Sequence, residues 1–226
     1  MNSNYLLSLK GVSKTFKSKD ENLTILNNVD IDIQKGEYIA TIGPSGSGKS
    51  TLLYIMGLLL NPDKGAILIE NNNALTLSDK KKSLLRNQFI GFIFQSYHLL
   101  PEFSALENII LPSILSGIPK HNALKRALNL LAKVNLLKRK SHKPSELSGG
   151  EQQRVCICRA LINKPSVIFA DEPTGNLDSH NASTITSILE DMIKEDNSTL
   201  VLATHNEKLA KRASRTIKLL DGKISE

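Results

Sequence analysis

The sequence predicts an α/β protein whose core strands form a largely parallel sheet, and three observations support this prediction. A short apolar run ends at Ile42 and leads through a glycine-rich turn into a helical pattern. A second apolar run, Val167–Ala170, is followed directly by two carboxylates, and a third, Thr199–Ala203, ends shortly before a histidine. Strands that alternate with helices form parallel sheets, which bind ligands at the carboxyl ends of their strands. We therefore expect the functional groups at these strand ends.

The glycine-rich turn reads GPSGSGKST and fits the pattern G-x-x-x-x-G-K-[ST]. A triphosphate carries several negative charges on closely spaced oxygens, and glycines leave backbone N–H groups bare to receive them. The helix that begins near Lys49 adds the positive end of its dipole. Lys49 can reach the β- and γ-phosphates, and the hydroxyl of Ser50 can bind Mg²⁺. The segment predicts a nucleoside triphosphate site formed by Gly43, Pro44, Ser45, Gly46, Ser47, Gly48, Lys49, Ser50 and Thr51.

Length and composition limit the class of protein. A chain of 226 residues with 40% apolar and 23% charged residues suits one large globular domain. The longest apolar stretch, Thr51–Leu60, is about ten residues, whereas a membrane span needs about 20. The N-terminus shows no signal-peptide pattern, so we expect a cytosolic protein unless a partner holds it elsewhere. The two cysteines, Cys156 and Cys158, are too few and too close for a disulfide framework or a zinc site.

The net charge of +7 raises the question of nucleic-acid binding. The basic residues are scattered in short clusters, and aromatic residues make up only 4% of the chain, which leaves few platforms for base stacking. We therefore expect no nucleic-acid partner. The same charge would suit an anionic membrane surface equally well.

The regions around the core strands differ in pattern. Near the N-terminus, Leu6–Val12 reads as a strand, and Val29–Ile33 alternates apolar and polar residues, as half-buried antiparallel strands do. After Gln95 the pattern is helical, and Ser104 with Glu107 forms a capping box that opens one helix. A β-rich beginning and a helical insertion are expected beside the parallel sheet.

The carboxylates that follow the second apolar run predict catalysis. Asp171 is suited to hold Mg²⁺, and Glu172 is suited to polarise an attacking water. A solvated acidic pair would be the ordinary interpretation of such residues at an isolated strand end. The phosphate-binding turn elsewhere in the chain favours the catalytic interpretation.

The segment Leu147–Arg154 reads LSGGEQQR and predicts a second anion site. It places the Ser148 hydroxyl and the bare N–H groups of Gly149 and Gly150 at a helix N-terminus. One nucleotide does not need two such sites far apart in the sequence. Two chains that face head to tail would bring the second site of each against the nucleotide of the other. This segment resembles the signature motif of ABC-type ATPases.

The resemblance implies a single ABC ATPase domain over residues 1–226. Its fold would be that of a P-loop NTPase, a RecA-like mixed sheet core with an N-terminal antiparallel β subdomain and an inserted α-helical subdomain. Residues 1–95 and 155–226 would form the core with the β subdomain, and residues 96–154 the helical subdomain that ends in the signature motif. The implied cofactors are ATP and Mg²⁺.

The resemblance also assigns roles along the chain. Gln95 is similar to the Q-loop glutamine, which binds Mg²⁺ and senses the coupled partner, and Asp178 ends a GNLD segment that resembles the D-loop at the dimer interface. His205 resembles the switch histidine at the γ-phosphate. Phe16 matches the aromatic residue that stacks on adenine, although many relatives carry Tyr there, and from its position alone a core Phe was equally plausible. The implied catalytic residues are Lys49, Glu172 and His205; the implied metal ligands are Ser50, Gln95 and Asp171; and Ser148, Gly149 and Gly150 would bind the partner's nucleotide.

Several longer strings are similar to the lipoprotein-releasing, LolD-type group. One of them is Phe94–Phe103, and within it His98–Phe103 is the most specific, because it lies just after Gln95, where such ATPases contact their membrane subunits. Asp171–Asp178 is shared with macrolide-exporter and FtsE-type relatives. The resemblance implies a head-to-tail homodimer that sandwiches ATP and works beneath separate integral membrane permeases. The dimer would be a peripheral protein at the cytoplasmic face of the bacterial inner membrane. It would drive the release of lipoproteins toward the outer membrane. An FtsE-type cell-division ATPase or a macrolide-exporter-like ATPase is the alternative, whereas a soluble P-loop kinase has no use for Leu147–Arg154.

Overall fold

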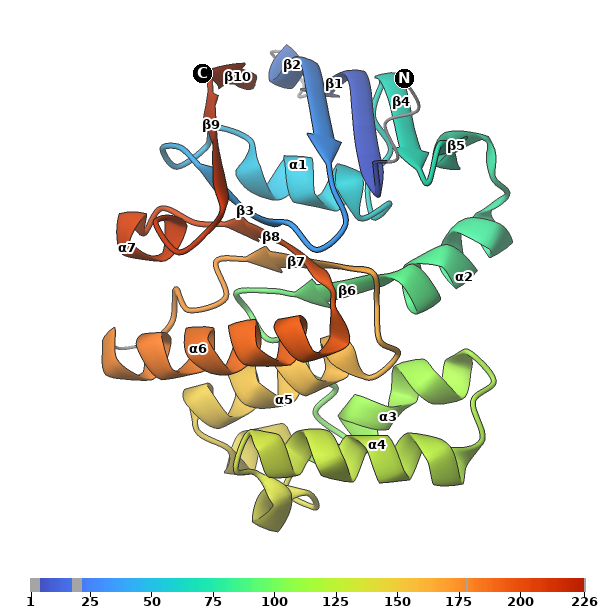
Figure 1. Cartoon of the computed structure of the whole chain (residues 1–226), viewed down its shortest axis with the longest axis vertical. Coiled ribbons are helices and arrows are strands. Elements are labelled where there is room, and N and C mark those ends of the chain that lie inside the picture. Colours follow the sequence, from blue (N-terminus) through green and yellow to red (C-terminus); the bar gives the residue numbers. More distant parts are fainter. Residues whose placement is uncertain (1–4, 18–21, 178, 226) are drawn as a thin grey trace. The chain divides into compact units, whose positions relative to one another are not determined.

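The computed structural model describes residues 5–17, 22–177 and 179–225 (Figure 1). The architecture is α/β with a mixed sheet and several helices, as predicted from the sequence. The chain separates into two compact units. The first contains residues Met1–Ser83 and Thr199–Glu226, and the second contains Leu84–Ser198. The predicted limits of the helical subdomain, 96–154, stay a prediction.

The first unit contains an antiparallel sheet of four strands in the order β2-β1-β4-β5. Leu7 lies at its centre, paired with Ile33 on one side and Ile69 on the other, and all three side chains are buried. The predicted N-terminal antiparallel β subdomain is therefore present. Its strands are β1 (Leu7–Lys17), β2 (Asn22–Ile33), β4 (Lys64–Ile69) and β5 (Asn72–Asn73), and the short 3-10 helix η1 (Ala74–Thr76) follows β5.

The first unit also contains parallel strands, in the order β10-β9-β3-β8. Strand β3 runs parallel to both of its neighbours, and β9 and β10 form the closing antiparallel hairpin. Every residue of β8 is buried, which agrees with its apolar run from Leu200 to Ala203, and the buried Thr199 hydroxyl accepts from the Gly36 N–H at 2.9 Å. The elements are β3 (Tyr38–Ile42), α1 (Lys49–Met56), β8 (Thr199–Ala203), α7 (Glu207–Ala210), β9 (Arg215–Leu220) and β10 (Lys223–Ser225), and α2 (Asp79–Phe89) leads along the chain into the second unit.

The second unit packs helices around α5 and two parallel strands, β6 and β7 (Figure 1). Helix α5 contacts α3, α4, α6 and β6. A Cβ on Gly91 of β6 would lie 2.7 Å from the carbonyl oxygen of Ala160, so this close approach of helix and strand requires glycine. The elements are β6 (Ile90–Ile93), α3 (Ala105–Leu115), α4 (Lys120–Lys133), η2 (Leu137–Arg139), η3 (Pro144–Glu146), α5 (Gly149–Leu161), β7 (Val167–Asp171) and α6 (Ser179–Asp196).

The N-cap of α3 and side chains in its first turn fix the loop that enters this helix. The predicted capping box is present: the backbone N–H of Ser104 donates to the Glu107 carboxylate at 2.8 Å, and the backbone N–H of Glu107 donates to the Ser104 hydroxyl. The hydrogen bond from the Ser104 hydroxyl lowers the pKa of Glu107. One turn into the helix, the fully buried amide of Asn108 donates to the carbonyl oxygens of Leu100, Phe103 and Ser104 and accepts from the Leu100 N–H. Asn108 therefore determines the path of this loop.

Among the described helices, none combines the length and the apolar character that crossing a bilayer requires.

Replacing Asn108 with Ala should lower the free energy of unfolding by about 2 kcal/mol, because several part-buried main-chain groups of the loop lose their hydrogen-bond partner at once. Urea unfolding followed by circular dichroism measures this change. Asn129→Ala is the matched control, because Asn129 is exposed on α4 in the same unit. Equal stability of the two variants would contradict the role given to Asn108.

Candidate functional site

The phosphate-binding turn has the expected shape. Gly46 and Gly48 have φ angles of 79° and 101°, in the left-handed region that favours glycine. Helix α1 begins at Lys49, and its first turn carries no acidic side chain to compete for the positive end of the dipole. The Lys49 ammonium is nearly buried and donates to the carbonyl oxygens of Gly43 and Pro44 at 2.8 and 2.9 Å. The charge of Lys49 is therefore held over the turn.

Backbone groups from other strands pack closely against this turn. A Cβ on Gly43 would lie 2.2 Å from the carbonyl oxygen of Leu219, and one on Gly48 would lie 2.8 Å from that of Ile25. Only glycine fits at these positions. The hydroxyl of Ser47 is buried and finds no hydrogen-bond partner among the residues that the structure describes. Bare N–H groups, a buried ammonium and an unsatisfied hydroxyl together fit a phosphate chain.

His205 lies at the same sheet edge as the phosphate-binding turn. Strand β8 runs parallel to β3, and the backbone N–H of Thr204 donates to the carbonyl oxygen of Thr41 at 3.1 Å. His205 follows one residue later, beside the end of β3 from which the turn starts. Asn206 caps α7 by accepting from the Lys208 N–H at 3.0 Å.

Phe16 is not a core residue. Its side chain is 44% exposed near the end of β1, opposite Leu23 of β2, which is 60% exposed. The Lys14 ammonium lies 5.6 Å from the centre of the Phe16 ring. The ring is exposed enough to stack on a purine, and its adenine-binding role stays a prediction.

In the second unit, the expected Mg²⁺ and water-activating residues follow two paired strands. Ile93 of β6 pairs with Ala170 of β7, so Gln95 and Glu172 lie two residues beyond a matched pair at one sheet edge. Asp171 ends β7 and is only 6% exposed.

Glu172 has an unusual backbone conformation. Its φ angle of 44° is in the left-handed region, which non-glycine residues seldom occupy. Residues held in such conformations cluster at functional sites.

Gln95 contacts the loop that follows Glu172. The carbonyl oxygen of Gln95 accepts from the Asn176 side chain at 2.9 Å, and a Cβ on Gly175 would lie 2.8 Å from the Gln95 amide nitrogen. The Q-loop candidate and the carboxylate candidates therefore lie in one cluster within this unit. Asp178, the expected D-loop residue, lies outside the described residues.

The signature segment opens α5 with its own capping box. Ser148 is the N-cap, its N–H donates to the Glu151 carboxylate at 2.8 Å, and its hydroxyl accepts from the Glu151 N–H at 3.3 Å. The hydrogen bond from the Ser148 N–H lowers the pKa of Glu151. Gly149 and Gly150 supply N–H groups of the first turn, which have no acceptor inside a helix. The segment thus offers the predicted N–H donors of Gly149 and Gly150, and the Glu151 carboxylate lies beside them.

Tyr97 lies at the signature segment, which was not predicted from the sequence. A Cβ on Gly149 would lie 2.8 Å from the Tyr97 hydroxyl. No sequence signal marks this contact, because the two residues are far apart in the chain and neither belongs to a joint motif.

The predicted residues thus gather in two groups. The first unit brings together the phosphate-binding turn and His205, and the second brings together Gln95, Asp171 and Glu172. In the part of the chain that the structure describes, no three His, Cys, Asp or Glu side chains gather to hold a metal ion. The expected Mg²⁺ ligands include a hydroxyl and an amide, so their role stays a prediction.

Comparisons with known proteins agree with this geometry. The family model for ABC transporters matches residues 26–175. The lipoprotein-releasing system ATP-binding protein LolD of Paramagnetospirillum magneticum is 45% identical over 99% of both chains. LolD of Bacteroides fragilis is 47% identical over 97% of this chain and all of its own.

A solved structure shares the fold. The ATP-binding cassette MJ0796, in a dimeric post-hydrolysis state bound to ADP and Pi, superposes with a TM-score of 0.90, 41% identity and 97% coverage of both chains. The predicted P-loop fold and ATPase activity are confirmed. With its phosphate-binding turn, its signature helix and these relatives, the chain belongs to the ABC transporter family, in which it is an ATP-hydrolysing cassette.

Proposed function

We propose that this ATPase drives the release of lipoproteins from the inner membrane toward the outer membrane. The observation that carries the proposal is similarity over nearly the whole chain, 45–47% identity, to proteins named as ATP-binding subunits of lipoprotein-releasing systems. The matched stretch covers nearly the whole chain, so it spans the segment after Gln95 as well as the nucleotide-binding residues.

In the proposed mechanism, the turn Gly43–Thr51 binds the phosphates of ATP and Lys49 compensates their charge. Ser50, Gln95 and Asp171 would hold Mg²⁺, which, when bound, neutralises charge on the phosphates. Glu172 accepts a proton from the attacking water as its oxygen bonds to the γ-phosphorus, and the bond to the bridging oxygen of ADP breaks.

Residues outside the phosphate-binding turn would complete each site. His205 contacts the γ-phosphate and holds it in line, and Phe16 stacks on adenine. The dimeric state of the MJ0796 cassette supports a head-to-tail homodimer for this chain. In it, Ser148–Gly150 of one chain would face the nucleotide of the other, with Asp178 near the interface.

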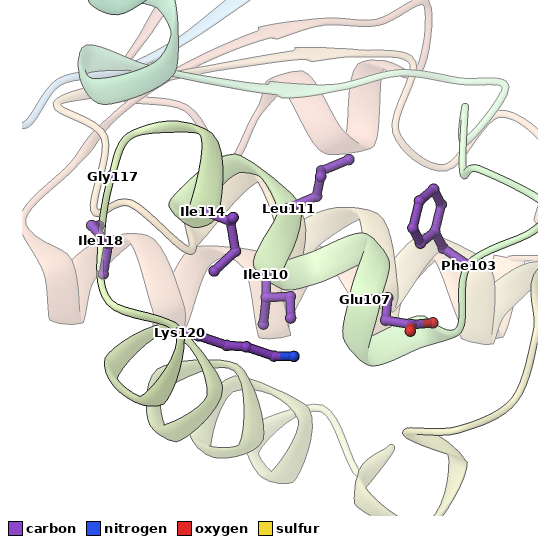
Figure 2. A pocket seen from close by; sticks show the side chains of 8 residues that line it. All are labelled: Phe103, Glu107, Ile110, Leu111, Ile114, Gly117, Ile118 and Lys120. Carbon is purple, nitrogen blue, oxygen red and sulfur yellow. The ribbon is translucent and has the colours of Figure 1, made fainter.

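An apolar groove on the second unit is the proposed docking surface for the membrane subunits. Its volume is about 430 Å³, and Figure 2 shows α3 presenting Ile110, Leu111 and Ile114 to it, with Phe103 at one end. Phe103 ends the segment that the sequence indicated for docking, and it is 39% exposed. The groove is lined by Phe103, Glu107, Ile110, Leu111, Ile114, Gly117, Ile118 and Lys120.

The proposed occupant of this groove is a short amphipathic helix on the cytoplasmic side of a membrane subunit. Such a helix would place its apolar side against α3, and its polar residues would pair with Glu107 and Lys120, which carry opposite charges and also line the groove. Docking of this kind would hold the ATPase at the cytoplasmic face of the inner membrane as a peripheral protein.

Glu172→Gln should abolish turnover while leaving ATP binding intact, because the amide cannot accept the proton of the attacking water. We expect a decrease in ATPase rate of about 100-fold or more. Sizing chromatography with ATP should show dimers accumulating, whereas Lys49→Ala should lose nucleotide affinity. Wild-type turnover in Glu172→Gln would remove this residue from the mechanism.

Mixing two inactive chains tests the composite sites. In a heterodimer of Lys49→Ala and Gly150→Asp chains, one site carries both lesions and the other carries none. The mixture should show ATPase activity above that of either variant alone. Heterodimers that form but stay inactive would contradict composite sites that work independently.

The docking surface is tested by Phe103→Ser combined with Ile114→Ser, which removes apolar contact area from the groove. Membrane proteins that co-purify with the wild-type subunit should be lost, and release of a labelled lipoprotein from spheroplasts should fall. Leu137→Ser is the matched control, because Leu137 is 45% exposed in the same unit but does not line the groove. Unchanged co-purification would exclude the groove, and co-purified cell-division proteins would favour an FtsE-type function.

A further inference from the structure

Two consecutive residues after Gln95 have strained backbone conformations. Tyr97 and His98 have φ angles of 47° and 50°, in the left-handed region that side-chain-bearing residues seldom occupy. Two such residues in succession persist only where their surroundings hold them. The segment leads directly into the loop that ends at Phe103 in the docking groove.

Side chains of α5 hold this strained segment. The Arg159 guanidinium donates to the carbonyl oxygens of His98 and Tyr97 at 2.5 and 2.7 Å, as its planar fork permits. The Cys156 thiol donates to the same Tyr97 carbonyl at 3.1 Å. Burial raises the pKa of Cys156 to about 11, so the thiol keeps the proton that it donates.

The side chain of Tyr97 reaches the other end of the same helix. Its hydroxyl lies 2.8 Å from where a Cβ on Gly149 would be, at the first residue of α5. Gly149 and Cys156 are separated by roughly 10 Å along a helix axis. Tyr97 therefore contacts α5 at two places: its hydroxyl lies at Gly149 in the signature segment, and its backbone carbonyl is held by Cys156 and Arg159.

We propose that Arg159 and Tyr97 are positioning residues that couple the docking surface to the signature segment. Asn108 fixes the loop from Leu100 to Ser104, so a displacement imposed at Phe103 is passed back to Tyr97 and His98. Arg159 then transmits it to α5, and the Tyr97 hydroxyl sets where the first turn of α5 lies. The proposed coupling depends on the docking surface proposed above. The contacts of Arg159 and Tyr97 with α5 are independent of that docking surface.

The first test compares Arg159→Met with Arg159→Lys in the isolated full-length subunit. Arg159→Met should lower kcat at least about fivefold, while the Kd and stoichiometry of ATP binding to the monomer stay unchanged, since the phosphate-binding turn is in the other unit. Arg159→Lys should recover part of the rate, because it keeps the charge and one donor but not the fork. A purely structural role predicts fewer ATP-binding sites and an unchanged kcat per site, and that result would overturn the proposal.

The second test uses the contact between Tyr97 and Gly149. Gly149→Ala should lower kcat because its methyl group meets the Tyr97 hydroxyl, whereas its other near neighbours lie at 3.8 Å. Adding Tyr97→Phe removes that hydroxyl and should restore most of the lost rate. A double variant as impaired as Gly149→Ala would show that the contact does not position the signature segment.

The coupling is measured in the complex with the co-purifying membrane proteins. Arg159→Lys should reduce the ratio of complex-stimulated to isolated ATPase activity, and an unchanged ratio would overturn the coupling. If the proposed docking surface is wrong, the results differ. The Phe103 and Ile114 variant then keeps its membrane partners, while the effects of the Arg159 and Gly149 variants on kcat persist in the isolated subunit.

Discussion

The nucleotide-binding unit depends on a close approach of neighbouring backbones at the phosphate-binding turn, which only glycines permit. The carbonyl oxygen of Ile25 in β2 lies so close to both Gly48 and Gly222 that a Cβ on either would come within 2.8 Å of it. The Asn27 N–H donates to the Gly222 carbonyl at 2.8 Å, which ties β2 to the closing hairpin. Strands from both ends of the chain therefore converge on one turn, and this explains why the first unit contains both N-terminal and C-terminal segments.

Helix α5 has a comparable place in the second unit, because both of its ends are fixed by side chains. The capping box of Ser148 and Glu151 fixes its beginning. At its end, Arg126 of α4 donates to the carbonyl oxygens of Leu161 and Ile162 and pairs with Asp196 at 2.7 Å. A helix held at both ends moves as a rigid element, so the signature segment follows any displacement of this unit.

Features that depend on residues close together in the chain could be predicted from the sequence. Residue spacing was sufficient for the phosphate-binding turn, for the buried strand that ends at Asp171, and for the capping box at Ser104. It was insufficient for Asn108 and Arg159, because their partners are backbone carbonyls, which every residue possesses and no motif records. The role of Phe16 was equally open, since exposure at the end of β1 depends on how far the sheet extends.

The burial of the two native cysteines has a consequence for labelling experiments. Both thiols are free and buried in α5, and burial raises the pKa of each, so little reactive thiolate forms at neutral pH. The native chain is therefore a nearly silent background for maleimide chemistry. A single cysteine introduced on an exposed position of each unit would carry a spectroscopic probe without removal of the native thiols, and the distance between the units could be followed through the ATPase cycle.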